Sequence, residues 1–315
     1  MSDAPAMNPV QVENLERLRP PLEDRPSYRS TLRLDLRHHI ETELVSVIDR
    51  VHAGSEGRGL WVGKRHLAAV HGCEARHLAE QETKFEWRVP LARGSVAHKA
   101  IELSMHLSGQ RDPSELVDDA IGRITDRETS LGDYLKRIDE ATLAELRSEC
   151  SALMASFLDT FPPLQRGWRP ATEVSKRSDL CGDGLTLAGK FDLTLGTPND
   201  TTAGRVIIDV KTGGFAQIHR EDLRFYALLE TLHTGVPPLI VATHYVDSGR
   251  LQAELVDEDL VWAAAHRTVD GVIRLAALAD EPSVAVKKAG PACKWCPIAD
   301  SCDVGQAWID ENDDW

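Results

Sequence analysis

The sequence has no long apolar run, no basic leader and no excess of positive charge, and each absence excludes a class of protein. No stretch approaches the roughly 18 consecutive apolar residues that a membrane-spanning helix requires. The opening "MSDAPAMNPV" is acidic and lacks the basic-then-apolar order of a secretory signal. We therefore expect a soluble, cytoplasmic protein without a membrane partner.

The charge balance of the chain is acidic. Lys and Arg total 36 against 50 Asp and Glu, a net charge of −14, which argues against broad electrostatic attraction to nucleic acid. Any surface that binds phosphate must therefore be local or depend on bound cations. The chain also lacks a G-x-x-x-x-G-K-[ST] phosphate loop, so it is not expected to be a helicase itself.

The chain does have enough apolar material for a large core, since 42% of its 315 residues are hydrophobic. Residues 1–35 show little periodicity and predict an irregular lead-in. Apolar spacing then predicts helices over 36–53, 64–81, 95–108, 114–125, 132–158, 219–234 and 257–280. Short β-branched segments predict strands within 169–177, 185–196, 204–212, 238–247 and 250–257. This order indicates an α/β fold with a small mixed central sheet flanked by helices.

An apolar stretch that ends in an acid and a lysine is the first candidate site. In "VIIDVKTGG", Asp209 and Lys211 are two residues apart, so on a strand they project from the same face. Asp192 lies on the preceding predicted strand, and the connection "TPNDTTAG" can fold the two strands side by side. Carboxylates that converge in this way suit Mg²⁺ or Mn²⁺. A charge pair at a strand end is the simpler alternative for Asp209 and Lys211.

A histidine adds to this constellation. In "RGSVAHKAIELSMH", Gly94 precedes His98, which falls in the first turns of a predicted helix. Taken alone, such a histidine is more often a capping or surface residue than a metal ligand. With "GKFD" and "IIDVKTG" downstream, it becomes a candidate ligand.

The order of these motifs, followed by a helix "DLRFYALL", resembles the RecB-like branch of the PD-(D/E)XK nuclease superfamily. The resemblance implies a restriction-endonuclease-like core. It also implies a divalent ion held by three side chains and one main-chain carbonyl, namely His98, Asp192, Asp209 and Val210. Lys211 would be the catalytic lysine.

Two further residues follow from the same resemblance. Tyr226 falls where these nucleases have a helix tyrosine that contacts the substrate, but the residue four positions earlier is Asp222 where the family has Gln. Glu173 matches a glutamate that could support a second metal, or it could simply face solvent. Basic residues near the motifs could line a groove or be ordinary surface charges: Lys64, Arg65, Arg93, Lys99, Arg220 and Arg224.

The cysteines form the second constellation. "PACKWCPIADSC" places Cys293, Cys296 and Cys302 in a C-x₂-C-x₅-C run, a spacing that indicates a metal site. Cys73 is the best candidate for a fourth ligand, with His71 as a lesser one. The ligands alone do not separate zinc from an iron–sulfur cluster. Two other cysteines, Cys150 and Cys181, lie in contexts that indicate structural or incidental roles.

An early cysteine paired with a late C-x₂-C-x₅-C run is similar to the iron–sulfur staple of AddB-type and CRISPR-associated RecB-like exonucleases. The resemblance implies a [4Fe–4S] cluster on Cys73, Cys293, Cys296 and Cys302, with Zn²⁺ as the alternative. Such a staple would close a loop of more than 200 residues and limit the unfolded chain.

These motifs together predict three regions: a partly irregular N-terminal extension over 1–60, a nuclease domain over 61–303 closed by the cysteines, and an acidic tail over 304–315. The leading function is a metal-dependent DNA nuclease, an exonuclease on single-stranded DNA or DNA ends that works through metal-activated water. A separate helicase, or another repair or defence protein, is a possible partner. An inactive nucleic-acid-binding or scaffold subunit of such a complex is the alternative, and action on another phosphate ester a third.

Overall fold

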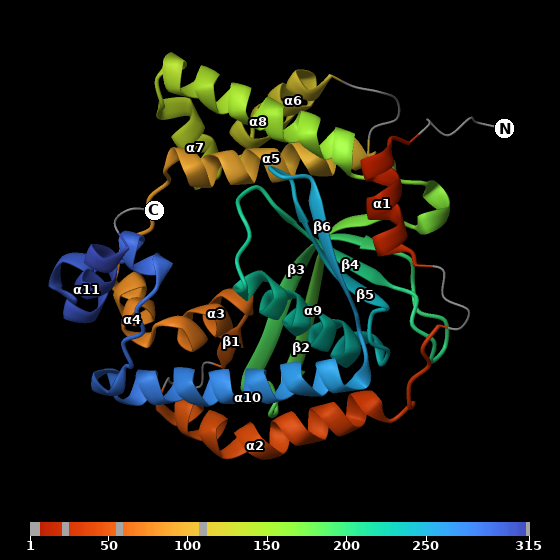
Figure 1. The fold of residues 1–315 in the computed structure, drawn as a ribbon. Coiled ribbons are helices and arrows are strands. Elements are labelled where there is room, and N and C mark those ends of the chain that lie inside the picture. Colours follow the sequence, from red (N-terminus) through yellow and green to blue (C-terminus); the bar gives the residue numbers. More distant parts are fainter. Residues whose placement is uncertain (1–6, 21–24, 55–58, 107–111, 313–315) are drawn as a thin grey trace.

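The computed structural model describes residues 7–20, 25–54, 59–106 and 112–312, and it has a mixed α/β fold with helices on both faces of one sheet (Figure 1). Parts of the predicted N-terminal extension, 1–6, 21–24 and 55–58, and the end of the predicted acidic tail, 313–315, lie outside these ranges. In the described ranges, every helix is too short or too polar to cross a membrane.

The sheet has six strands, and most of its neighbours are antiparallel. Five strands follow the order β1-β3-β4-β5-β6, and β2 pairs with β3. β1 runs parallel to β3, and β4 runs parallel to β5. The strands are β1 (Leu60–Val62), β2 (Ala171–Leu180), β3 (Leu185–Leu195), β4 (Val206–Lys211), β5 (Ile240–Tyr245) and β6 (Arg250–Leu255).

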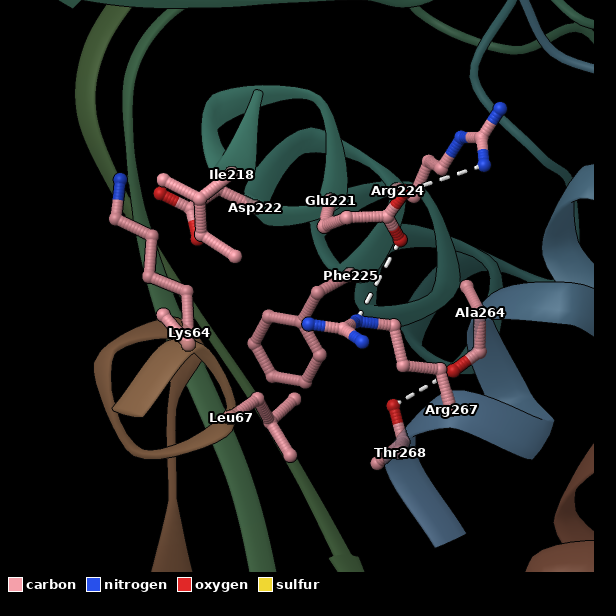
Figure 2. A pocket seen from close by; sticks show the side chains of 11 residues that line it. Lys64, Leu67, Ile218, Glu221, Asp222, Arg224, Phe225, Ala264, Arg267 and Thr268 are labelled. Carbon is pink, nitrogen blue, oxygen red and sulfur yellow. Dashed lines mark hydrogen bonds and ion pairs between the residues drawn. The ribbon is translucent and has the colours of Figure 1, made fainter. Parts of the chain in front are cut away.

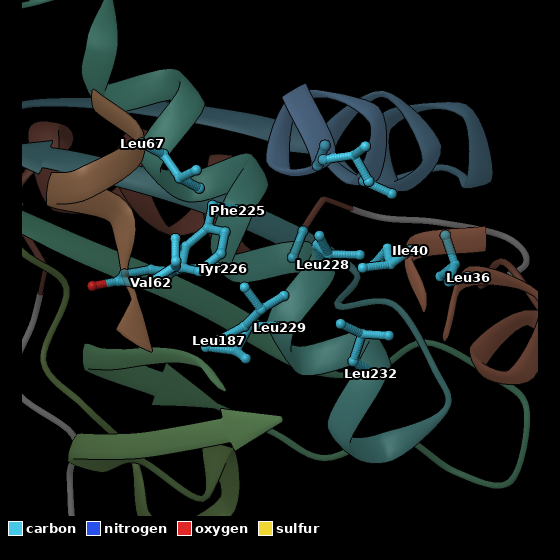
Figure 3. Close-up of a cluster of buried hydrophobic side chains, with 14 of the residues drawn as sticks. Leu36, Ile40, Val62, Leu67, Leu187, Phe225, Tyr226, Leu228, Leu229 and Leu232 are labelled. Atoms are coloured by element: carbon cyan, nitrogen blue, oxygen red, sulfur yellow. The ribbon is translucent and has the colours of Figure 1, made fainter. Parts of the chain in front are cut away.

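Two hydrophobic clusters hold the helices against the sheet. Along β4, Ile207 belongs to one cluster whereas Val206, Ile208 and Val210 belong to the other, as strand alternation requires. Figure 3 shows side chains of the first cluster, contributed by helix α2, helix α3, helix α9 and the sheet. The first cluster takes side chains from α2 (Leu32–Gly54), α3 (Lys64–Gly72), α9 (Ile218–Thr234) and α10 (Glu258–Asp280). The second takes them from α1 (Pro9–Leu18), α5 (Val89–His106), α6 (Pro113–Thr125), α7 (Ser130–Arg137) and α8 (Glu140–Thr160).

The predicted irregular lead-in was wrong in part, because it contains helix α1 (Pro9–Leu18). Asn8 caps this helix by accepting a hydrogen bond from the Gln11 amide at 2.9 Å, and a proline follows at the first helical position. The Asn14 side chain then donates to the carbonyl of Thr160 at 2.9 Å, which docks the helix against the end of α8. Polar contacts rather than apolar periodicity define α1, and this is why the pattern did not reveal it.

Two helices that the periodicity predicted as continuous are each broken in the structure. The 64–81 segment splits into α3 (Lys64–Gly72) and α4 (Glu74–Glu82), because Cys73 between them is extended. The 132–158 segment splits at Ile138, and the Asp139 side chain caps α8 through the Thr142 amide at 2.9 Å. The predicted tail holds a further helix, α11 (Asp303–Glu311), preceded by short 3₁₀ turns.

Candidate active site

The site lies in a gap along one edge of β3. β2 covers the other edge of this strand throughout, so β1 and β4 must share the remaining edge. β1 pairs only with Leu185–Leu187 and β4 only with Leu193–Leu195. Between these contacts the strands part, and the Val210 amide donates to the Asp192 carboxylate at 2.8 Å instead of to a main-chain carbonyl. The sheet therefore places Asp192 at the fork between two strands.

Asp209 lies on the β4 side of this fork, and its side chain is 1% exposed. Lys64 Nζ lies 2.8 Å from its Oδ1, and Lys211 Nζ lies 2.8 Å from its Oδ2. Burial alone would raise the pKa of Asp209, but these two ammonium groups outweigh it and hold the pKa below its ordinary value. The predicted side-by-side placement of Asp209 and Lys211 is therefore present.

His98 approaches from α5, and its Nδ1 lies 3.8 Å from Asp192 Oδ2. Burial and the neighbouring Asp209 raise the pKa of Asp192, while His98 acts against them. These groups line an open cavity of about 400 Å³. Its walls are Lys64, His98, Asp192, the segment Asp209–Gly214 and His219.

Carboxylate oxygens, an imidazole and the carbonyl of Val210 form a donor set that fits Mg²⁺ or Mn²⁺. In the described ranges, however, no three His, Cys, Asp or Glu side chains close around one point tightly enough to hold an ion. At Asp209 the two carboxylate oxygens are not free to bind an ion, because each contacts a lysine ammonium group.

Two glycines of the motifs lie where other elements approach closely. A Cβ on Gly94, one turn before His98, would lie 3.3 Å from Thr212 Oγ1, so this glycine lets α5 approach the loop after β4. A Cβ on Gly189 would lie 2.7 Å from the Tyr226 ring, so this glycine makes room for the aromatic side chain on α9. The glycines of "G-x-x-x-H" and "GKFD" thus make room for the elements that border the site.

Tyr226 is buried behind the cavity and does not line it. Its hydroxyl donates to the carbonyl of Lys190 at 2.7 Å, and Lys64 Nζ lies 4.7 Å from the centre of its ring. The ring therefore supports Lys64 by a cation–π contact. Contact of Tyr226 with a substrate, which the resemblance implied, stays a prediction.

The remaining acid of the sequence analysis, Glu173, forms an ion pair with Lys190 and does not line the cavity. Its backbone φ is 55°, a left-handed value that is uncommon for a residue other than glycine. It stands between two residue pairs of the β2–β3 ladder, Thr172 with Leu193 and Val174 with Phe191, and hence opposite Asp192.

No specific sign in the sequence indicated that Lys64 belongs to the site, although its ammonium contacts Asp209 directly. Lys64 begins α3 directly after β1, a strand of three residues that is too short to show alternation. Burial alone would lower the pKa of Lys64, but Asp209 outweighs it and raises the pKa. His219 was missed as well; burial and Lys211 lower its pKa to about 4, and its Nδ1 lies 3.2 Å from the Tyr245 hydroxyl.

One small pocket, separate from the cavity at the acids, is lined by the four predicted cysteines: Cys73, Cys293, Cys296 and Cys302. All four are free thiols. Cys73 Sγ accepts from the Lys288 amide, and Cys302 Sγ from the Gly305 amide, both at 3.4 Å. His71 contacts the carbonyl of Arg267 at 2.9 Å and lies outside the pocket. The structure therefore gathers the predicted thiols, although they do not converge on one point as tightly as a single ion needs.

Comparison with known proteins identifies the family to which this site belongs. Residues 65–303 match the model of the PD-(D/E)XK nuclease superfamily. The crystal structure of SSO0001 is similar at 14% identity and a TM-score of 0.29, over 66% of this chain and 94% of that one. No curated protein matches. Because the family match covers most of the chain, including the fork with its two acids and Lys211, this chain belongs to the PD-(D/E)XK nuclease superfamily.

Proposed function

We propose that this protein is a metal-dependent DNA nuclease of the RecB-like branch, acting as an exonuclease on single-stranded DNA or DNA ends. One observation carries the proposal: His98, Asp192, Asp209 and Lys211 line a single cavity of about 400 Å³ at the strand fork. The cavity is open enough for a phosphodiester group to reach these side chains.

His98, Asp192, Asp209 and the carbonyl of Val210 would hold the divalent ion of this nuclease. Such an ion supplies Lewis acidity toward a phosphoryl oxygen and lowers the pKa of water. The chain supplies the rest. Asp209 holds the Lys211 ammonium at the cavity wall through the 2.8 Å contact, where it can stabilise negative charge that develops on the phosphate or orient a water.

A preference for single strands is supported by the loop that follows β4. Phe215 is 66% exposed and comes directly after Gly213 and Gly214, which line the cavity. Cβ atoms on these glycines would meet nothing within 4 Å, so this rim is open. An exposed aromatic ring beside a phosphate-binding cavity can stack on an unpaired base. Duplex DNA would have to be opened first, and with no phosphate loop in the chain a separate helicase would supply that motor.

The cysteine pocket is proposed to hold a [4Fe–4S] cluster on Cys73, Cys293, Cys296 and Cys302, with Zn²⁺ as the alternative. The four free thiols around one pocket fit such a group by their chemistry. Main-chain amides that donate to Cys73 and Cys302 also suit thiolate ligands. The cluster would tie the end of α3 to the 3₁₀ turns near the C-terminus.

A second function is favoured by one observation. Lys64 and Lys211 already neutralise Asp209, and a chain that used the fold only to bind nucleic acid would not need an ion there. An inactive binding or scaffold subunit of a repair or defence complex would therefore keep this arrangement and cleave nothing.

The two functions are separated by cleavage of end-labelled single-stranded and double-stranded DNA with Mn²⁺ or Mg²⁺. A nuclease will cleave the single strand, lose cleavage in EDTA and lose it in Asp192→Asn. Asp118→Asn is the matched control, because Asp118 is an exposed acid on α6 whose ion pair with Arg147 is at the surface. Folded, cluster-loaded protein that binds DNA without cleaving it would leave the binding subunit as the function.

A further inference from the structure

We propose that Lys64 is an exchangeable counter-ion of the active site: its ammonium neutralises Asp209 and moves toward Asp222 when a divalent cation binds. The inference rests on the metal site of the proposed function. It assigns distinct roles to the two lysines that contact Asp209, with Lys211 remaining in place and Lys64 giving way.

The Lys64 ammonium lies where a divalent cation would bind. Lys64 Nζ lies 2.8 Å from Asp209 Oδ1. Lys64 also lines the same cavity as Asp192, so its charge lies beside both carboxylates. A cation that binds between Asp192 and Asp209 must therefore compete with the charge of Lys64.

The charge balance of the site changes when a divalent ion binds. The formal charges of the two carboxylates and the two ammonium groups sum to zero: Asp192, Asp209, Lys64 and Lys211. A divalent ion adds two positive charges to this site, in which Asp209 is almost fully buried. Uncompensated charge in such a place is costly, because burial removes the water that would screen it. A further carboxylate within reach of Lys64 would lower this cost, and Asp222 meets that need.

Asp222 is the proposed destination of the ammonium. Asp222 and Tyr226 are four residues apart on α9 and so share a helix face, and Lys64 lies over the Tyr226 ring. Lys64 and Asp222 line the same small pocket, and Figure 2 shows both side chains ending in the upper left of the view. Among the described residues, Lys64 forms its ion pair with Asp209, and Asp222 forms none. Asp222 is therefore a nearby carboxylate without a direct ion-pair partner among the described residues.

The test is Mn²⁺ binding by titration calorimetry at fixed pH near neutrality, on wild-type protein and on Lys64→Met. Removing the competing ammonium should tighten Mn²⁺ binding by about 5- to 50-fold, within the usual range of coupling between two ligands. Arg65→Met is the matched control, since Arg65 is the exposed next residue of α3, and it should change the affinity by less than about twofold. Unchanged or weaker Mn²⁺ binding by Lys64→Met would overturn the proposal.

The destination is tested by a second substitution. Asp222→Asn should weaken Mn²⁺ binding in the wild type, because the displaced ammonium loses its new partner, and most of this effect should vanish in the Lys64→Met background. Equal effects in both backgrounds would mean that Asp222 acts only as a distant charge, and would overturn the move toward Asp222. Lys64→Arg keeps the charge and should leave the affinity near that of the wild type, which separates loss of competition from disturbed folding.

The outcomes also separate this inference from the proposed function. Wild-type protein that binds no Mn²⁺ would overturn both the exchange and the metal site. Mn²⁺-dependent cleavage with no change of affinity in Lys64→Met would leave the nuclease standing and overturn the exchange alone.

Discussion

The acidic fork and the cysteine pocket are both candidate metal sites, but they differ in what holds them without a ligand. At the fork, Asp209 contacts two ammonium groups of its own chain, and two hydrophobic clusters surround β4. At the cysteine pocket, the described chain from Ala285 to Asn312 buries one hydrophobic side chain, Cys302. The fork should therefore keep its shape without an ion, whereas the cysteine region needs a bound group in place of a core.

The largest effect should come from the fork, and it should be on chemistry rather than stability. Lys211→Ala removes the ammonium at the cavity wall and should slow cleavage by about 10²- to 10³-fold, as removal of a charge-stabilising donor does elsewhere. Thermal unfolding should change little, because Lys64 still neutralises Asp209. Lys136→Ala, an exposed lysine on α7, is the control in the same cleavage and unfolding assays. Retained cleavage by Lys211→Ala would contradict the assignment of the catalytic lysine.

The cysteine pocket should show the opposite behaviour. Cys296→Ser should bleach the brown colour expected of anaerobically purified protein and lower the melting temperature by about 10 °C, since closing a loop of more than 200 residues contributes about 5 kcal/mol. Limited proteolysis should then cut first between Ala285 and Asn312.

Cys181→Ser is the control for this experiment, because Cys181 lies in the turn between β2 and β3 and outside the pocket. It should keep both the iron and the melting temperature. A colourless wild type with stoichiometric zinc would replace the cluster by a zinc site and leave the predicted loss of stability unchanged.

The same contrast explains what the sequence could and could not predict. The fork depends on strand alternation, so the pair Asp209 and Lys211 was predictable from spacing alone, and the apolar runs predicted five of the six strands. The cysteine spacing likewise predicted that Cys293, Cys296 and Cys302 belong to one site, and they line one pocket. These features are local, or depend on motifs with a fixed period.

Features that depend on unlike segments meeting in space were not predictable. Lys64 reaches Asp209 only because β1 and β4 share one edge of β3, and a three-residue strand leaves no periodic signal. Helix α1 is defined by Asn8 and Asn14, whose polar contacts have no apolar pattern. Asp222 was noted only as a departure from a family motif, and its position near Lys64 now gives that departure a physical reason.

A smaller effect should reveal the charge balance at the fork. Burial, against the pull of Lys64 and Lys211, raises the pKa of Asp222 from 3.8 to about 6. Between pH 3.8 and about 6, the folded protein therefore keeps a proton on Asp222 that the unfolded chain has released. Asp222 thus contributes stability below pH 3.8, and this contribution is lost as the pH rises through about 6. In EDTA, Asp222→Asn should be more stable than wild type by about 1–2 kcal/mol near neutral pH, allowing for partial exposure, and the gain should disappear near pH 4.

The measurement for Asp222 is the difference in thermal unfolding between the two proteins across this pH range. His219 titrates in the same window with the opposite sign, because its pKa is lowered to about 4. It is present in both proteins, so its contribution cancels in the difference. A constant gap between wild type and Asp222→Asn at every pH would contradict the raised pKa.

The smallest effect is expected from two glycine substitutions that separate the activity of the fork from the stability of the protein. Gly94 and Gly122 both lie inside helices, but a Cβ on Gly122 would meet nothing within 4 Å whereas one on Gly94 would lie 3.3 Å from Thr212 Oγ1. Gly122→Ala should stabilise the protein by about 0.5–1 kcal/mol through helix propensity, with unchanged cleavage. Gly94→Ala gains the same propensity but pushes the loop after β4 away from His98, so cleavage should fall severalfold while the melting temperature holds. Equal cleavage by both variants would mean that the close approach of α5 to this loop does not position the site.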